Sequence, residues 1–277
     1  MKTLQKFTIQ VLCLTVLLAV GKGAFAAEHE ELVLPDNTNG QPISFVSCPA
    51  IQDTSTVPCW FADHGDTRYF LGIQQDIGAA FHPPQLKHRV LVEGRILDGY
   101  RLCGAPVIHP VTISVLPEMD LQCNEMVPAI PGIEPPPHER GAGPSNDGLE
   151  PRERAAPQPL PEPPFEAREF VLSFTFDSAV MRGTVTRIIS QAFQYARQID
   201  ASAIEITAYR ASSLLTGGQE LIEQAHIAES RAEKLHTIFL EAGFDEDLFS
   251  VSASPGYLRG NGIADHLLRK AVIRVIP

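Results

Sequence analysis

Residues 170–176 read FVLSFTF, and this stretch decides the fold of the C-terminal half of the chain. Phenylalanine and leucine side chains alternate there with Val171, Ser173 and Thr175, which is the pattern of a strand with one buried face. At 183–198 apolar residues recur at intervals of three and four, which is the pattern of an amphipathic helix. A strand followed by such a helix predicts a layered fold in which helices cover a sheet.

The same kinds of element continue to the C-terminus. Residues 203–208 (AIEITA), 249–253 (FSVSA) and 271–276 (AVIRVI) favour strands. Apolar residues from 221 to 242 keep helical spacing, and Gly243 stands where that helix would end. We therefore predict an α+β sandwich over 169–277, with both helices packed on one sheet.

The first 26 residues have the composition of a secretory signal peptide. Two lysines precede an apolar run at 11–20, and Ala-Phe-Ala at 24–26 is a small-x-small cleavage pattern. Ten apolar residues reach about 15 Å as a helix, half of a bilayer's hydrocarbon core, so we expect cleavage rather than a membrane anchor. No later segment approaches 18 consecutive apolar residues. The mature chain is expected in the periplasm, without a transmembrane segment.

Four cysteines remain after that cleavage: Cys48, Cys59, Cys103 and Cys123. An even number in an oxidising compartment predicts two disulfides. A zinc site with four thiolates is the alternative, but its ligands normally come as two close pairs, which these spacings do not provide. Three pairings are open. We favour Cys59 with Cys103 and Cys48 with Cys123, because the outer pair would close the ends of a domain.

Residues 27–125 are expected to form a small all-β domain stapled by these disulfides. Runs at 68–73, 88–96 and 110–115 are rich in β-branched residues and are separated by Gly, Pro and Asp. A glycine inside the second run, where a strand would bend, favours a five-stranded OB-like barrel. That fold often binds nucleic acid or sugar. The formal net charge of −11 argues against nucleic acid, because phosphates are neutralised by clustered Lys and Arg.

This domain offers few groups for chemistry. The tetrapeptide DHGD at 63–66 places His64 between carboxylates and could ligate a metal, but Asp and Gly are turn formers, so a polar hairpin turn is favoured. Trp60 is expected to be a core residue beside a disulfide. The sequence has no Gly-x-Ser-x-Gly elbow and no phosphate loop. We therefore predict a protein that is not an enzyme and has no cofactor and no metal.

Residues 126–168 are interpreted as a linker. Twelve of the 23 prolines lie there, with no apolar periodicity. Such a segment cannot bury a core and is expected to be extended and solvated. A linker of this length would let the two domains work apart.

Three motifs of the C-terminal half resemble the OmpA-like peptidoglycan-binding domain family. Phe174-Thr-Phe-Asp-Ser178 is similar to the family's Phe-x-Phe-Asp-Ser strand end. Ile227-Ala-Glu-Ser-Arg-Ala232 is similar to its Leu-Ser-x-x-Arg-Ala helix, and 269–275 to its closing Arg-Arg-Val strand. The resemblance covers 169–277 and implies a bacterial cell-envelope protein, in the periplasm and associated with the outer membrane.

The resemblance also implies a ligand site. In the family, an Asp after the second strand and the Arg of the long helix hold the zwitterionic head of diaminopimelate in the peptidoglycan stem peptide. The guanidinium binds the ligand's carboxylate, and the Asp binds its ammonium. Arg231 matches the family's Arg, and Tyr209 and Arg210 are further candidate ligand-binding residues.

One of these two ligand-binding residues is missing, because Ala211 stands in the place of the Asp. Glu220 or Glu223, from a loop that is longer than in the family, could replace it. The alternative for Arg231 is a solvated arginine paired with a nearby Glu, which would contribute well under about 1 kcal/mol.

The leading functional hypothesis is non-covalent association with peptidoglycan. The alternative is an envelope adaptor, whose OmpA-like module is a degenerate protein-interaction domain and whose partners are other envelope proteins. A third hypothesis gives the N-terminal domain a metal or an enzymatic activity through His64.

Overall fold

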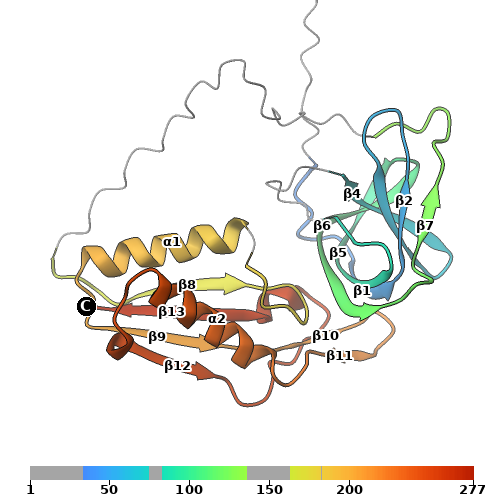
Figure 1. The fold of residues 1–277 in the computed structure, drawn as a ribbon. Coiled ribbons are helices and arrows are strands. Elements are labelled where there is room, and N and C mark those ends of the chain that lie inside the picture. Colours follow the sequence, from blue (N-terminus) through green and yellow to red (C-terminus); the bar gives the residue numbers. More distant parts are fainter. Residues whose placement is uncertain (1–33, 75–82, 136–162, 182) are drawn as a thin grey trace, which may run out of the picture.

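The computed structural model describes residues 34–74, 83–135, 163–181 and 183–277. The expected signal peptide lies outside these residues, as does most of the proline-rich segment. We call 34–135 the N-terminal part and 163–277 the C-terminal part. Figure 1 shows the N-terminal part as strands only and the C-terminal part as strands with two long helices.

The N-terminal part is one sheet in the strand order β1-β5-β6-β4-β3-β2-β7. The seven strands are β1 (Pro42–Ser47), β2 (Pro49–Gln52), β3 (Cys59–His64), β4 (Thr67–Ile73), β5 (His88–Leu102), β6 (Ala105–Met119) and β7 (Glu125–Val127). The sequence favoured five strands. The runs named at 68–73, 88–96 and 110–115 lie in β4, β5 and β6. The other four strands were not named, and β2 and β7 are too short to show an alternating pattern. Because β7 pairs with β2, the sheet continues two residues past the expected boundary at 125.

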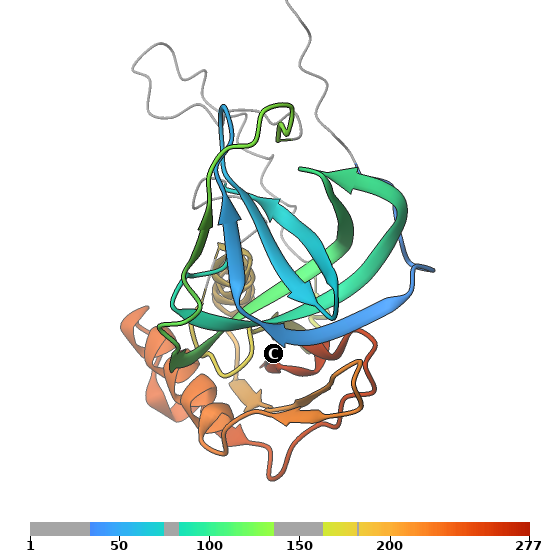
Figure 2. The same ribbon diagram turned by 90° about the vertical axis from the view of Figure 1, so that its right-hand side faces the viewer.

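The two longest strands, β5 and β6, form an antiparallel hairpin that curves round the N-terminal part (Figure 2). The register shifts just after Gly94. A Cβ on Gly94 would lie 2.4 Å from the carbonyl oxygen of Pro110, so the two strands can approach this closely only with glycine there. The bend expected from this glycine is present.

The cysteines form the two disulfides that the sequence favoured, Cys48–Cys123 and Cys59–Cys103. Cys48–Cys123 links the junction of β1 and β2 to the segment before β7, and so joins an early and a late segment of the N-terminal part.

The two other features singled out at 60–66 are structural. Trp60 is 5% exposed, and its Nε1 donates a hydrogen bond to Gln74. His64 ends β3 and stacks on Phe45, and Gly65 has φ of +58° in the tight turn to β4. The DHGD tetrapeptide is therefore the hairpin turn that was favoured.

The C-terminal part is a four-stranded sheet in the order β12-β9-β13-β8, with α1 and α2 over one face (Figure 1). Its elements are β8 (Arg168–Ser173), α1 (Gly183–Gln198), β9 (Ala203–Ala208), β10 (Ser212–Leu214), β11 (Glu220–Ile222), α2 (Ile227–Glu241), η1 (Glu246–Leu248), β12 (Phe249–Ala253), η2 (Asp265–Leu268) and β13 (Lys270–Ile276). Its core joins the inward residues of the sheet to the apolar faces of the helices. The predicted α+β layering is present.

One predicted element is wrong at its start. The apolar spacing from 221 to 242 was interpreted as one helix, but α2 begins only at Ile227. Residues 220–222 instead form β11, which pairs with β10 in a hairpin. Gly217 and Gly218 close this hairpin, and the φ of +83° at Gly218 suits glycine. The glycine pair therefore favours a hairpin turn at a place where the apolar spacing predicted the start of a helix.

The two parts contact each other, which differs from the expectation that they work apart (Figures 1 and 2). Arg269, just before β13, forms a buried ion pair with Glu93 of β5. Ser213 of β10 donates a hydrogen bond to the same carboxylate, at 2.9 Å. Ser44 of β1 and Thr216 exchange two hydrogen bonds. No pattern in the sequence indicated this interface.

No helix of the described residues is long and apolar enough to cross a membrane.

Candidate functional site around Arg231

Arg231 lies in the second turn of α2, and its side chain is completely buried. It shares a helix face with Ile227 and Leu235, and this face packs on the sheet. The local sequence therefore directs the guanidinium inward. The alternative of a solvated arginine is wrong for this reason.

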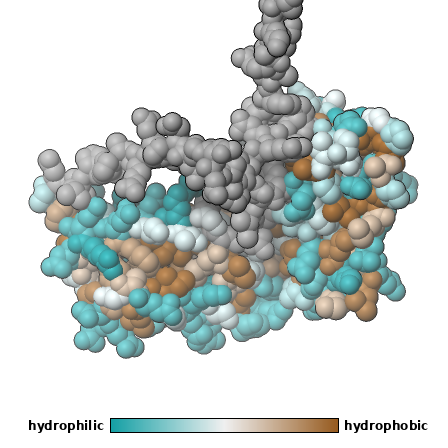
Figure 3. All heavy atoms as spheres, turned by 45° about the horizontal axis from the view of Figure 1, so that its top comes forward, coloured by the Kyte–Doolittle hydropathy of each residue, from teal (hydrophilic) through white to brown (hydrophobic). Residues whose placement is uncertain are grey.

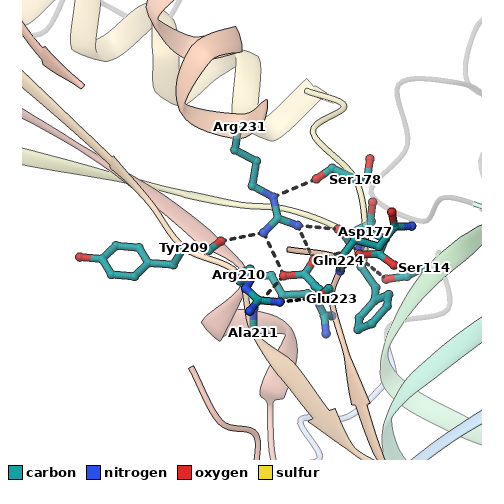
Figure 4. A network of polar contacts seen from close by, with 12 residues as sticks. Ser114, Asp177, Ser178, Tyr209, Arg210, Ala211, Glu223, Gln224 and Arg231 are labelled. Carbon is teal, nitrogen blue, oxygen red and sulfur yellow. Dashed lines mark hydrogen bonds and ion pairs between the residues drawn. The ribbon is translucent and has the colours of Figure 1, made fainter. Parts of the chain in front are cut away.

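The guanidinium has five N–H groups, and acceptors of the chain itself take all five (Figure 4). Nε donates to the carbonyl of Ser178 at 2.9 Å. Nη1 donates to the carbonyl of Tyr209 at 2.7 Å and to Glu223 Oε2 at 3.0 Å. Nη2 donates to the carbonyl of Thr175 at 3.2 Å and to Glu223 Oε1 at 2.5 Å. No N–H of Arg231 is left for a ligand in this arrangement.

Glu223, the residue after β11, forms the centre of the site and is 1% exposed. Besides its two bonds with Arg231, its carboxylate accepts the backbone N–H of Asp177 at 2.9 Å and that of Ala211 at 2.8 Å. A buried carboxylate requires such a set of donors and a cation. Glu223 thereby ties the ends of β8 and β9 to α2.

Asp177 adds a second carboxylate beside this pair. Its Oδ1 accepts the backbone N–H of Gln224 at 2.7 Å. Burial raises the pKa of Asp177 above its ordinary value, and the negative charge of Glu223 raises it further. The Phe-Asp-Ser motif at 176–178 therefore fixes the backbone at 223–224.

The structure brings the predicted residues Tyr209 and Arg210 to the same place, but not as free ligand-binding groups. Tyr209 contacts Arg231 only through its backbone carbonyl, and its ring points away from the guanidinium (Figure 4). Arg210 donates from Nη1 to the backbone carbonyl of Glu223 at 2.8 Å, and from Nε to that of Gly256 at 3.1 Å. Both residues support the loop that carries Glu223.

Of the two carboxylates proposed to replace the missing Asp, only Glu223 is at the site. Glu220 instead accepts a hydrogen bond from Ser212 at 2.7 Å and pairs with Arg259. Ala211 is fully buried. Both candidates follow the turn at 217–218: Glu220 begins β11 and pairs with Leu214, whereas Glu223 comes directly after β11, where the chain runs towards α2.

A second buried arginine was missed as a functional residue. Arg269 is 0% exposed, and its Nη1 donates to Glu93 Oε1 at 3.1 Å and to Ser213 Oγ at 2.8 Å. Glu93 was not recognised as buried, because at alternate positions of β5 it shares a face with Arg89 and Arg95, as a solvent-facing strand residue would.

A cavity of about 110 Å³ adjoins this second pair, between the two parts. Ser44 and Glu93 line it from the N-terminal part, and Asp265 and His266 line it from the C-terminal part. Among the described residues, Ser44 Oγ and His266 Nδ1 are buried without a hydrogen-bond partner. The contact between the two parts is therefore polar, and side chains do not fill it completely.

No family model matches the sequence, and no curated protein does either. Among solved structures, the chain is similar to the OmpA-like domain of FopA1 from Francisella tularensis subsp. tularensis SCHU S4, at 16% identity and a TM-score of 0.31, covering 40% of this chain and 73% of that one. It is also similar to a MotB-like protein from Desulfovibrio vulgaris, at 10% identity and a TM-score of 0.32, covering 40% and 75%. Neither similarity assigns a ligand to this chain.

Proposed function

We propose that the chain is a non-enzymatic adaptor of the bacterial cell envelope, in which the OmpA-like module has become a protein-interaction domain. The observation that carries this proposal is the saturation of Arg231: its own chain accepts all five N–H groups. Arg231, which would bind a stem peptide in the family, thereby stabilises the fold of its own chain instead.

The energies favour this interpretation. A stem-peptide carboxylate could reach the guanidinium only if Glu223 left it. Leaving one member of a buried ion pair unpaired costs about 3–5 kcal/mol. A hydrogen bond to a charged group returns about 1.5–3 kcal/mol. Exchange of Glu223 for an external carboxylate is therefore unfavourable.

Exposed apolar side chains also support an interaction role. Met119, Leu121 and Met126, all near the end of β6 and in β7, are 68–70% exposed. Figure 3 shows apolar residues at the surface of both parts, among hydrophilic ones. Apolar groups gathered at a surface commonly mark contacts with other proteins.

Sedimentation with purified, diaminopimelate-containing peptidoglycan sacculi tests the proposal. We expect the mature protein to stay in the supernatant, together with Arg231→Lys and with the control Arg187→Lys, which changes an exposed arginine of α1. Retention of the wild type that Arg231→Lys alone abolishes, at unchanged helical circular dichroism, would restore the hypothesis of peptidoglycan association.

A further inference from the structure

A groove of about 630 Å³ opens in the C-terminal part, between α2 and β12. The helix side contributes Ala225, Ala228, Glu229, Ala232 and Glu233. The strand side contributes 251–256, and Arg210 also lines the groove. Ala228 and Ala232 are buried, and their small side chains leave room for another chain to approach.

One wall of the groove is an open sheet edge. β12 is the outermost strand and pairs, among the described residues, only with β9 (Figure 1). Four of its five residues are exposed, and Val251 is 37% exposed although it lies on the helix-covered side of the sheet. Its sequence, FSVSA, has no charge and no proline. Sheet edges that are protected from further pairing normally carry charged residues or proline. Because β12 has neither, its edge can accept an added strand.

The other wall is acidic. Glu229 and Glu233 are both exposed on α2, and neither forms an ion pair within the described part of the chain. Arg210 offsets only one of these charges, and its Nε and Nη1 already donate to carbonyls. A cation therefore fits this rim better than an anion.

The spacing of the two glutamates suits an extended chain. Residues four apart on a helix are about 6 Å apart along its axis, at about 1.5 Å per residue. Alternate residues of a strand are about 6.6 Å apart. α2 lies along β12 (Figure 1), so alternate side chains of an added strand could reach Glu229 and Glu233 in turn.

We propose that the groove binds an extended segment of another protein that carries Lys or Arg at alternate positions. Its backbone pairs with the free edge of β12. The aliphatic stems of the basic side chains cover the alanines, and their charged ends meet the two glutamates. This inference rests on the proposed adaptor function and names the chemistry of its partner.

A second copy of the chain fits the groove less well. It would bring its own Glu229 and Glu233, and acidic residues at 245–247 precede its β12. The chain as a whole has a formal net charge of −11. Pairing of two β12 edges would therefore place like charges together.

The probe is a synthetic peptide, acetyl-TKTKTKTKT-amide, titrated into the mature protein at low salt and followed by calorimetry. We expect binding that the matched peptide TETETETET does not show. Two further versions of the lysine peptide carry backbone N-methyl groups, one at every Thr and the other at every Lys. Only alternate N–H groups of a strand donate hydrogen bonds to a given neighbouring strand, so we expect one version to lose binding and the other to keep it.

Two protein variants complete the test. The double reversal Glu229→Lys with Glu233→Lys is expected to weaken peptide binding by about 10-fold or more, since two attractions become repulsions. Glu241→Lys, at the far end of α2, is the charge-matched control and is expected to bind as the wild type does.

Three results would overturn the inference: no binding of the lysine peptide, equal binding of the glutamate peptide, or a double reversal without effect. A fourth is self-association of the wild type that Val251→Lys abolishes, because the occupant would then be a second copy. The sacculus experiment is independent of all four. If the peptide experiment fails and the protein does not sediment with sacculi, only the proposed groove is contradicted. If the protein sediments with sacculi through Arg231, the adaptor function itself is contradicted.

Discussion

Arg231 shows how the role of one residue depends on a second residue that no motif includes. The resemblance singled out Arg231, and the longer loop suggested Glu220 or Glu223 as a replacement for the missing Asp. The choice between them depended on the hairpin at 212–222, which is a matter of backbone geometry and not of residue type. The backbone acceptors at Thr175, Ser178 and Tyr209 could not be predicted, because every residue has a carbonyl.

Glu223→Gln is the most direct test at this scale. The amide keeps the shape of the side chain but leaves the charge of Arg231 buried without a counter-ion. We expect the free energy of unfolding to fall by about 3–5 kcal/mol, measured by urea denaturation. The control Glu220→Gln removes only a pair with the mostly exposed Arg259, because the amide oxygen can still accept the hydrogen bond from Ser212, so its effect is expected to stay below about 1 kcal/mol. Equal effects of the two variants would contradict the central role of Glu223.

At the scale of elements, the sequence predicted the bounds of helices and strands best where apolar residues recur with a regular period. The bounds of α1, β9 and β12 agree with the patterns at 183–198, 203–208 and 249–253. In α1 and β9 one buried face repeats with one period, and in β12 serine alternates with Phe249, Val251 and Ala253 although four of its five residues are exposed. The short strands β2, β7, β10 and β11 have three or four residues each, too few for a period to emerge. Their pairing partners, and not their own sequences, hold them in place.

The turn between β10 and β11 gives a prediction with an adjacent control. Gly218 has φ of +83°, and a Cβ there would meet no atom within 4 Å, so only backbone strain opposes a side chain. We expect Gly218→Ala to lower the free energy of unfolding by about 1–2 kcal/mol. Gly217→Ala, one residue earlier, has the same open space without the positive φ and is expected to be neutral or slightly stabilising. Urea denaturation of both variants measures the difference.

At the scale of the whole molecule, the proline-rich segment predicted two domains, and no sequence pattern predicted the contact between the N-terminal and C-terminal parts. Glu93 and Arg269 are 176 residues apart, and neither lies in a pattern that points to the other. Local periodicity reports which face of an element is buried, and it does not report which distant charge lies opposite. The sequence therefore predicted two folds and missed the interface.

The contact between the parts can be tested by cutting the chain. After cleavage at a protease site inserted in the proline-rich segment, we expect the two fragments to elute together in size-exclusion chromatography. Glu93→Lys places two cations in the buried interface and is expected to separate them. The control Glu118→Lys changes an exposed residue of β6 and is expected to leave the fragments together. Separation of the wild-type fragments would show that the buried ion pair does not hold the parts.

We expect His266 to make the contact between the two parts sensitive to pH. Burial lowers its pKa below the ordinary 6.5, Arg269 lowers it further, and Glu93 and Asp265 oppose the shift. The folded protein therefore binds this proton less readily than the unfolded chain does. The stability due to neutral His266 is complete above pH 6.5 and is lost as the pH falls through 6.5 towards the folded pKa.

Thermal unfolding between pH 5 and 7.5 measures this dependence. We expect His266→Gln to flatten the fall in melting temperature on the acidic side, whereas His226→Gln, at an exposed position before α2, should follow the wild-type curve. Parallel curves for the wild type and His266→Gln would exclude His266 as the cause.

The pairing of Glu93 with Arg269 also has a consequence for the order in which the protein matures. Chains emerge N-terminus first, and Glu93 precedes Arg269 by 176 residues, so β5 is available before the cation that its carboxylate pairs with. During that interval the Glu93 carboxylate has no cation to accompany it into a buried site, and water must solvate it. The N-terminal sheet therefore completes its packing only after the last strand of the chain has been made.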